Sequence, residues 1–169
     1  LALLIGVGGA IGIYLGGRIA DFMAARRGQQ WLPWVVAISS LMTMPLLYLT
    51  FMAQTPMAAI AAYALPAMLG TLYVAPGFAL IQNSTPLEMR SVAAAINLFI
   101  TNIIGLGLGP FSVGFFSDLF AQSYGVDGLR WGLATTIVIL LWGVLHYWRC
   151  GVMIKRERPS AGVARSQQA

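Results

Sequence analysis

The chain has 169 residues, of which 59% are hydrophobic and only 9% are charged. Soluble domains carry about a quarter charged residues, so this composition excludes a water-exposed globular surface. The net charge of +5 does not indicate a nucleic-acid partner, because the basic residues lie at the ends of apolar segments rather than along one polar face.

Five apolar segments follow one another, each close to the roughly 20 residues that cross about 30 Å of hydrocarbon as a helix. They cover residues 1–23, 32–53, 57–81, 92–116 and 131–148. All are apolar on every side, whereas the strands of a membrane barrel are about 10 residues long and alternate. The sequence therefore predicts an all-α polytopic membrane protein, with a transmembrane bundle in residues 1–150 and a disordered tail in residues 151–169.

Lys and Arg are distributed unequally between the two sides of this arrangement, nine on one side and one on the other. The nine are Arg18, Arg26, Arg27, Arg90, Arg149, Lys155, Arg156, Arg158 and Arg165. Because cytoplasmic loops retain positive charge, the tail and the loops after the first and third helices are predicted to be cytoplasmic. Leu1 lies inside an apolar run without an initiator Met or a basic leader, so we expect the chain to be truncated.

Glycines in two segments are spaced for close helix packing. In the first segment Gly8, Gly12 and Gly16 lie four residues apart on one face, and Gly105 and Gly109 repeat the spacing in the fourth. Such faces let another helix approach closely, although glycine is also simply frequent in membrane helices. The second segment has no glycine, which favours a helix that faces lipid.

The end of the first segment combines Gly17 and Asp21 with the basic pair Arg26 and Arg27. An acid at a helix end can pair with a nearby arginine or with the positive N-terminus of another helix, and so form a latch that a conformational change must break. The same residues also fit a plain positive-inside anchor, and spacing alone does not separate the two interpretations.

The third segment contains Pro66, Gly70, Pro76 and Gly77, which predict an interrupted helix in the middle of the membrane. Broken helices are tolerated there only where protein or a water-filled cavity covers the freed backbone groups, so this helix is a candidate for lining a pathway. The polar candidates for a substrate cavity are Tyr63, Thr71 and Tyr73 on this helix and Asn97 and Thr101 on the fourth. The alternative is that these side chains only join helices to one another.

An enzyme is not indicated by any group of residues. The sequence has no His, Asp, Glu and Cys cluster suited to a metal and no Ser or Cys matched with a His and an acid. We therefore predict no catalytic residues, no metal and no cofactor. No charged residue lies deep in a segment either, although intramembrane acids usually carry proton coupling.

Several motifs resemble the major facilitator superfamily, and within it the spinster-like transporters, particularly the bacterial ones. Residues 17–21 (GRIAD), together with Arg26 and Arg27, look like the superfamily's cytoplasmic motif as it recurs between helices eight and nine. The succession PLEMR at 86–90, NIIGLGLGP at 102–110 and GFFSD at 114–118 is similar to the helix-eleven region of spinster-like proteins. The later GLRW at 128–131 resembles the start of their helix twelve.

The resemblance implies that the five segments are equivalent to helices eight to twelve, which is most of the C-terminal six-helix half of that fold. It also implies a secondary active or facilitative transporter in the bacterial inner membrane, which moves a small organic or lipid-like solute by alternating access. The expected partners are the lipid bilayer, the solute and the missing N-terminal half, without which we expect no transport. In that fold helices eight and eleven meet the other half, helix ten lines the cavity, and helices nine and twelve face lipid.

A function of another class fits the same residues. A non-transporting membrane module, such as an assembly subunit or a lipid scramblase, would also be built from five apolar helices without a polar reactive cluster. It would bind a partner or flip lipid without saturable solute uptake.

Overall fold

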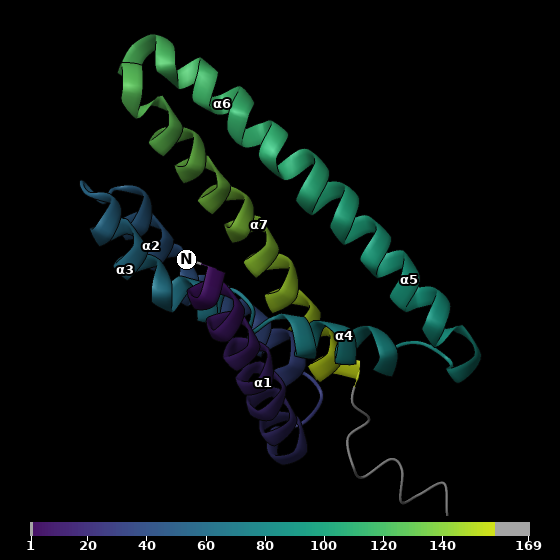
Figure 1. Cartoon of the computed structure of the whole chain (residues 1–169). Coiled ribbons are helices and arrows are strands. Elements are labelled where there is room, and N and C mark those ends of the chain that lie inside the picture. The colour runs from purple at the N-terminus through teal and green to yellow at the C-terminus, as the bar shows by residue number, and fades with distance from the viewer. Residues whose placement is uncertain (1, 158–169) are drawn as a thin grey trace, which may run out of the picture.

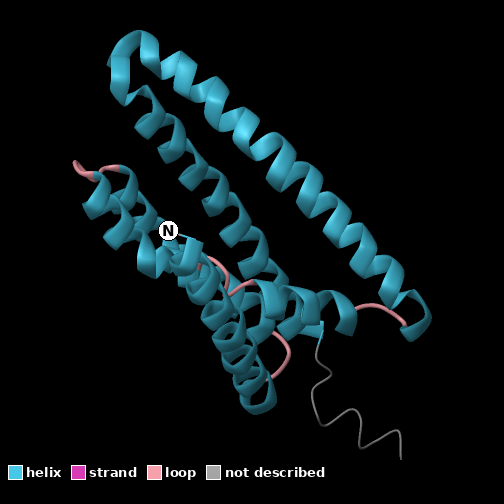
Figure 2. Ribbon diagram, viewed as in Figure 1, coloured by secondary structure: helices cyan, strands magenta, loops and turns pink. Residues whose placement is uncertain are grey.

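The computed structural model describes residues 2–157, and within them every regular element is helical. Figures 1 and 2 show long helices joined by short connections. The elements are α1 (Ala2–Arg27), α2 (Trp31–Phe51), α3 (Pro56–Leu69), α4 (Val74–Asn83), the 3₁₀ turn η1 (Leu87–Met89), α5 (Arg90–Thr101), the π-helical segment η2 (Asn102–Leu108), α6 (Gly109–Tyr124), the 3₁₀ turn η3 (Gly125–Asp127) and α7 (Gly128–Glu157). The all-α polytopic fold is thereby confirmed.

Four continuous helical runs are long and apolar enough to cross a membrane. They are Ala2–Arg27, Trp31–Phe51, Pro56–Asn83 and Leu87–Glu157. The last run has 71 residues and reverses direction at η3, so that α6 packs antiparallel against α7 (Figure 1). It therefore supplies two passes, and the described residues contain the five transmembrane passes that the sequence predicts.

Local chemistry explains where the helices end. The φ of Gly28 is 102°, and its N–H bonds to the carbonyl of Ala24 at 2.8 Å, which is the glycine stop of a helix C-terminus. At the next turn the hydroxyl of Thr55 accepts a hydrogen bond from the N–H of Ala58 at 3.2 Å, and Pro56 occupies the first helical position. The chain reverses before α7 at Gly125, whose φ is 57°.

The helix α2 forms the centre of the molecule, contrary to the expectation that it faces lipid. It packs against α1, α3, α4 and α7. Ala37, Ser39 and Thr43 are buried on it, as are larger side chains such as Val36 and Met44. Small hydroxyl and methyl side chains permit close helix packing as glycine does, so the absence of glycine did not indicate a lipid-facing helix.

The segments α5, η2 and α6 form one continuous rod that lies apart from most of the bundle (Figure 1). Within the bundle α5 packs only on α4, while α6 packs on α7. None of the residues from Arg90 to Tyr124 is buried. Most of this apolar rod is thus open to lipid or to another protein segment.

The last helix continues further than the sequence predicts. Residues 151–157, which were assigned to the tail, belong to α7, whereas residues 158–169 lie outside the described part. The helix extends because no proline occurs between Gly128 and Glu157, and because Lys155 and Arg156 in its last turn complement the helix dipole. In addition, Gly151 is packed beneath the indole of Trp34, which holds this part of α7 against α2.

Candidate functional site

The transmembrane helix formed by α3 and α4 is interrupted at residues 70–73, as its prolines predict. The helical ladder changes there to tighter bonds: the N–H of Thr71 bonds to the carbonyl of Met68 at 3.3 Å, and the N–H of Val74 to the carbonyl of Thr71 at 3.2 Å. Pro76 has no N–H, so the carbonyl of Leu72 has no helical donor. The break therefore presents free backbone polarity at membrane depth.

The glycine face of α1 covers this break. A Cβ built on Gly12 would lie 2.1 Å from the carbonyl oxygen of Met68, and one on Gly16 would lie 2.1 Å from that of Leu72. Only glycine permits such an approach between a helix and a neighbouring backbone. The carbonyls of Met68 and Leu72 are thus packed against the glycine face of α1, which keeps them from lipid, and that of Met68 also accepts hydrogen bonds from the N–H and the hydroxyl of Thr71.

Thr71 ties the two helices together across the same contact. Its hydroxyl lies 3.1 Å from the carbonyl oxygen of Gly9 on α1 and 3.0 Å from that of Met68 in its own helix. Thr71 therefore serves helix packing in this structure. Gly8 lies at the edge of the contact, since a Cβ on it would meet the N of Met68 only at 3.9 Å.

Tyr73 lies at the other side of the break and is 42% exposed. Its side chain lines a cavity of about 190 Å³ between α2, α4 and α7. The other lining residues are Val36, Ser40, Ile139, Leu140, Gly143 and Tyr147. Three hydroxyl groups, on Tyr73, Ser40 and Tyr147, therefore share an otherwise apolar cavity, and sequence reasoning found only the first of them.

The remaining cavity candidates lie elsewhere. Tyr63 is half-buried on α3, nearly three helical turns before Tyr73. Asn97 and Thr101 are on α5, which does not pack against α3. The structure thus does not gather the five candidates in one place: Thr71 and Tyr73 lie within the break, and Asn97 and Thr101 belong to the separate rod.

The latch residues lie at one end of α1, and they form no ion pair with one another. Between residues 2 and 157 the one salt bridge joins Arg130 to Asp127. Asp21 is exposed, while the guanidinium of Arg26 stacks over the ring of Phe22 at 4.1 Å and that of Arg27 lies 5.3 Å from the ring of Trp31. Gly17 approaches α4, where a Cβ would contact that of Ala75 at 3.4 Å.

Within residues 2–157, Gly105 and Gly109 on the rod are not in close contact with another helix, unlike the glycine face of α1. A Cβ on Gly105 would meet nothing within 4 Å among the described residues, and one on Gly109 would meet only the carbonyl of Ile104 in its own rod. Both glycines line a cavity of about 610 Å³ between the rod and α7, together with Thr136 and Ile139. The structure therefore leaves a cavity beside Gly105 and Gly109, whereas Gly12 and Gly16 are in close contact with the broken helix.

Two close contacts were missed from the sequence. Gly128 and Gly132 on α7 carry the same four-residue spacing and pack on α6, where a Cβ on Gly132 would lie 2.9 Å from the N of Ser117. The four-residue spacing of these two glycines was the available signal for this contact. The indole of Trp34 stacks on Trp148 with ring centroids 5.5 Å apart and donates to its carbonyl at 3.3 Å. Nothing in the sequence pairs these two tryptophans.

No protein-family model matches the chain, and no solved structure matches it. The chain is 33% identical over 156 residues to an MFS-type efflux pump of Mycolicibacterium smegmatis. The match covers 92% of this chain but 36% of the relative, so the chain spans about a third of the length of the protein it resembles. This similarity accompanies a fold of apolar helices that are long enough to cross a membrane.

Proposed function

We propose that the chain is the C-terminal part of a spinster-like transporter of the major facilitator superfamily, with its five passes equivalent to helices eight to twelve. In this proposal it moves a small organic or lipid-like solute by alternating access. The observation that carries the proposal is the 33% identity to an efflux pump over nearly the whole chain. From the name of that relative we infer that solute leaves the cell.

The broken helix α3–α4 supports the assignment to the cavity-lining helix ten. Interrupted helices occur at substrate sites of transporters, where a cavity or neighbouring protein covers the freed backbone groups. Here α1 covers one side of the break, and the cavity with Tyr73, Ser40 and Tyr147 adjoins the other. We assign these three hydroxyls to hydrogen bonding with the polar end of the solute.

The unpartnered rod α5–η2–α6 supports a place for it at the interface with the N-terminal half. Residues 90–124 are mostly apolar and include no buried side chain in this structure. Helices that are apolar on all sides face lipid or other helices. In the proposal Asn97 and Thr101 meet the N-terminal half, and the π-helical η2 is where the rod bends during the transport cycle.

The basic end of α1 supports a membrane orientation and a latch. The nine-to-one distribution of Lys and Arg supports a cytoplasmic C-terminus. From the resemblance to bacterial transporters we propose that the protein lies in a bacterial inner membrane. The carboxylate of Asp21 is exposed and has no basic partner in the described part of the chain, so it is available to the positive N-terminus of a helix from the other half. In the proposal Gly17, one helical turn before Asp21, lets that helix approach α1 closely.

The test is uptake into proteoliposomes that contain the protein at its full natural length, measured with a panel of labelled amphipathic solutes. Saturable uptake of at least one solute is expected. Tyr73→Phe should then raise KM about fivefold, because one hydrogen bond contributes about 1 kcal/mol. Tyr14→Phe is the matched control, since Tyr14 is 66% exposed on α1. Uptake that is unsaturable for every solute would refute the proposal.

A further inference from the structure

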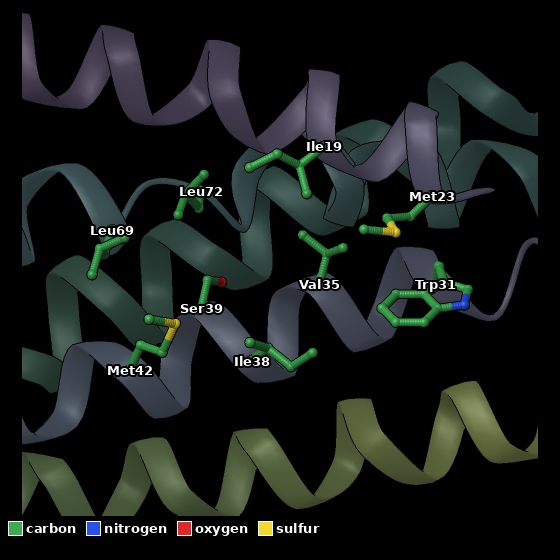
Figure 3. Close-up of a pocket in the computed structure, with 9 residues that line it drawn as sticks. All are labelled: Ile19, Met23, Trp31, Val35, Ile38, Ser39, Met42, Leu69 and Leu72. Atoms are coloured by element: carbon green, nitrogen blue, oxygen red, sulfur yellow. The ribbon is translucent and has the colours of Figure 1, made fainter. Parts of the chain in front are cut away.

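A second cavity lies between α1 and α2, on the side of α2 away from the proposed solute site. Its volume is about 300 Å³, and Figure 3 shows its side chains converging from α1, from α2 and from the end of α3 with the break that follows it. It is lined by Ile19, Met23, Trp31, Val35, Ile38, Ser39, Met42, Leu69 and Leu72. We call it the α1–α2 groove. Its open side is marked by the exposure of Ile19, Ile38 and Met42, which are 42%, 40% and 56% accessible.

The groove offers nothing to a polar ligand. The hydroxyl of Ser39, its one aliphatic polar group, already donates to the carbonyl of Val36 at 3.0 Å. The flexible thioethers of Met23 and Met42 adapt well to a chain of variable shape. Between Trp31 and Met42 the helix rises about 16 Å, which is half of the roughly 30 Å hydrocarbon core. The groove thus has the composition and depth of one acyl chain in one leaflet.

A positive charge lies at one end of the groove. Ile19, Met23 and Arg27 follow at four-residue spacing on one face of α1, so Arg27 stands one turn beyond the groove wall. Its guanidinium lies 5.3 Å from the ring centre of Trp31, which lines the groove. The amide of Gln30 donates to the carbonyl of Arg27 and fixes the backbone there. Residues 2–157 supply no acidic group in a salt bridge with Arg27.

We propose that the α1–α2 groove binds an anionic phospholipid, with one acyl chain in the groove and the headgroup phosphate on Arg27. An arginine beside an interfacial tryptophan is suited to a phosphate at the membrane surface. Basic sites between transmembrane helices are known to select anionic lipids. The site shares Arg27 with the proposed latch, but lipid binding itself requires only that α1, α2 and the adjoining end of α3 are packed together in a bilayer.

The test uses the protein at its full natural length, purified in mild detergent and studied by native mass spectrometry. Phosphatidylglycerol should bind more tightly than phosphatidylcholine of the same chains. Arg27→Gln should weaken binding of phosphatidylglycerol about fivefold and leave phosphatidylcholine unchanged. Arg156→Gln is the matched control: it removes a charge from exposed residue 156 in the last turn of α7, and no change is expected.

A second measurement needs no change to the charge. Phosphatidylglycerol with brominated acyl chains should quench tryptophan fluorescence, and Trp31→Phe should remove a large share of that quenching. Equal binding of the two lipids, an unchanged preference in Arg27→Gln, or quenching that survives Trp31→Phe in full would each overturn the proposal. The proposal would also be overturned if no lipid binds and another segment of the protein is found to fill the groove.

Discussion

Substitution of Gly12 by alanine probes the contact on which the geometry of the broken helix depends. The added Cβ would lie 2.1 Å from the carbonyl oxygen of Met68 and 2.2 Å from the hydroxyl of Thr71. Ordinary contact begins at 3.4 Å, so α1 must withdraw by about 1.3 Å, the difference between 3.4 and 2.1 Å. The Met68 oxygen belongs to the backbone and cannot rotate away as a flexible side chain can.

The size of the effect follows from three opposing contributions. Overpacking of a close contact costs about 1–3 kcal/mol. Withdrawal of α1 also lengthens the hydrogen bond from Thr71 to Gly9, and such bonds in membranes contribute about 0.6 kcal/mol. Alanine regains about 1 kcal/mol of helix propensity over glycine. We expect a net destabilisation of about 0.6–2.6 kcal/mol in Gly12→Ala.

The assay is equilibrium unfolding of the purified protein in mixed micelles, followed by circular dichroism while the fraction of denaturing detergent is raised. Gly6→Ala is the matched control, because a Cβ there would meet nothing within 4 Å and only the gain in helix propensity remains. Gly12→Ala should therefore unfold at a lower detergent fraction than Gly6→Ala. If the two variants unfold together, α1 does not approach the break as closely as the structure indicates.

Three further substitutions test other contacts by the same unfolding measurement. Gly132→Leu should destabilise the α6–α7 hairpin by at least about 1 kcal/mol through overpacking. Gly143→Leu is the control and should not destabilise it, because a Cβ at Gly143 meets nothing within 4 Å. Equal destabilisation by the two variants would contradict the close packing of Gly132 on α6. Trp34→Ala should cost about 0.5–1.5 kcal/mol beyond the lost area because it removes the stack on Trp148, and an unchanged midpoint would refute that stack. Thr71→Val should cost about 0.6 kcal/mol through loss of the bond to α1, and a stabilised variant would count against it.

The helices and their order were predictable because membrane helices must satisfy their own backbone in long apolar stretches. The break in the third pass was predictable for a related reason: Pro66 and Pro76 remove donors whatever surrounds them. Both features depend on local chemistry. Neither requires knowledge of which helices are neighbours.

Neighbour relationships were harder to predict, as α2 and the rod illustrate. The absence of glycine suggested that α2 faces lipid, yet Ala37, Ser39 and Thr43 let it pack centrally. Gly105 and Gly109 suggested close packing, yet they line a cavity beside α7. Small residues permit close approach but do not select a partner, since lipid and protein are equally apolar to a membrane helix.

The candidate polar residues separated for the same reason. Tyr73 and Asn97 both lie within apolar passes, but the sequence does not say that Tyr73 shares a cavity with Tyr147, or that α5 stands apart from α3. Such proximity is set by the tertiary arrangement. The stack of Trp34 on Trp148, 114 residues away, is likewise invisible to periodicity.

The transporter assignment is tested most directly by solute efflux from cells that lack their own efflux pumps and express the protein at its full natural length. The account predicts saturable loss of a preloaded amphipathic solute that Gly12→Leu abolishes and Gly6→Leu retains, because only the former displaces α1 from the break. If cells with abundant, correctly inserted protein retain every solute tested as well as cells without it, the chain does not belong to a transporter of this kind.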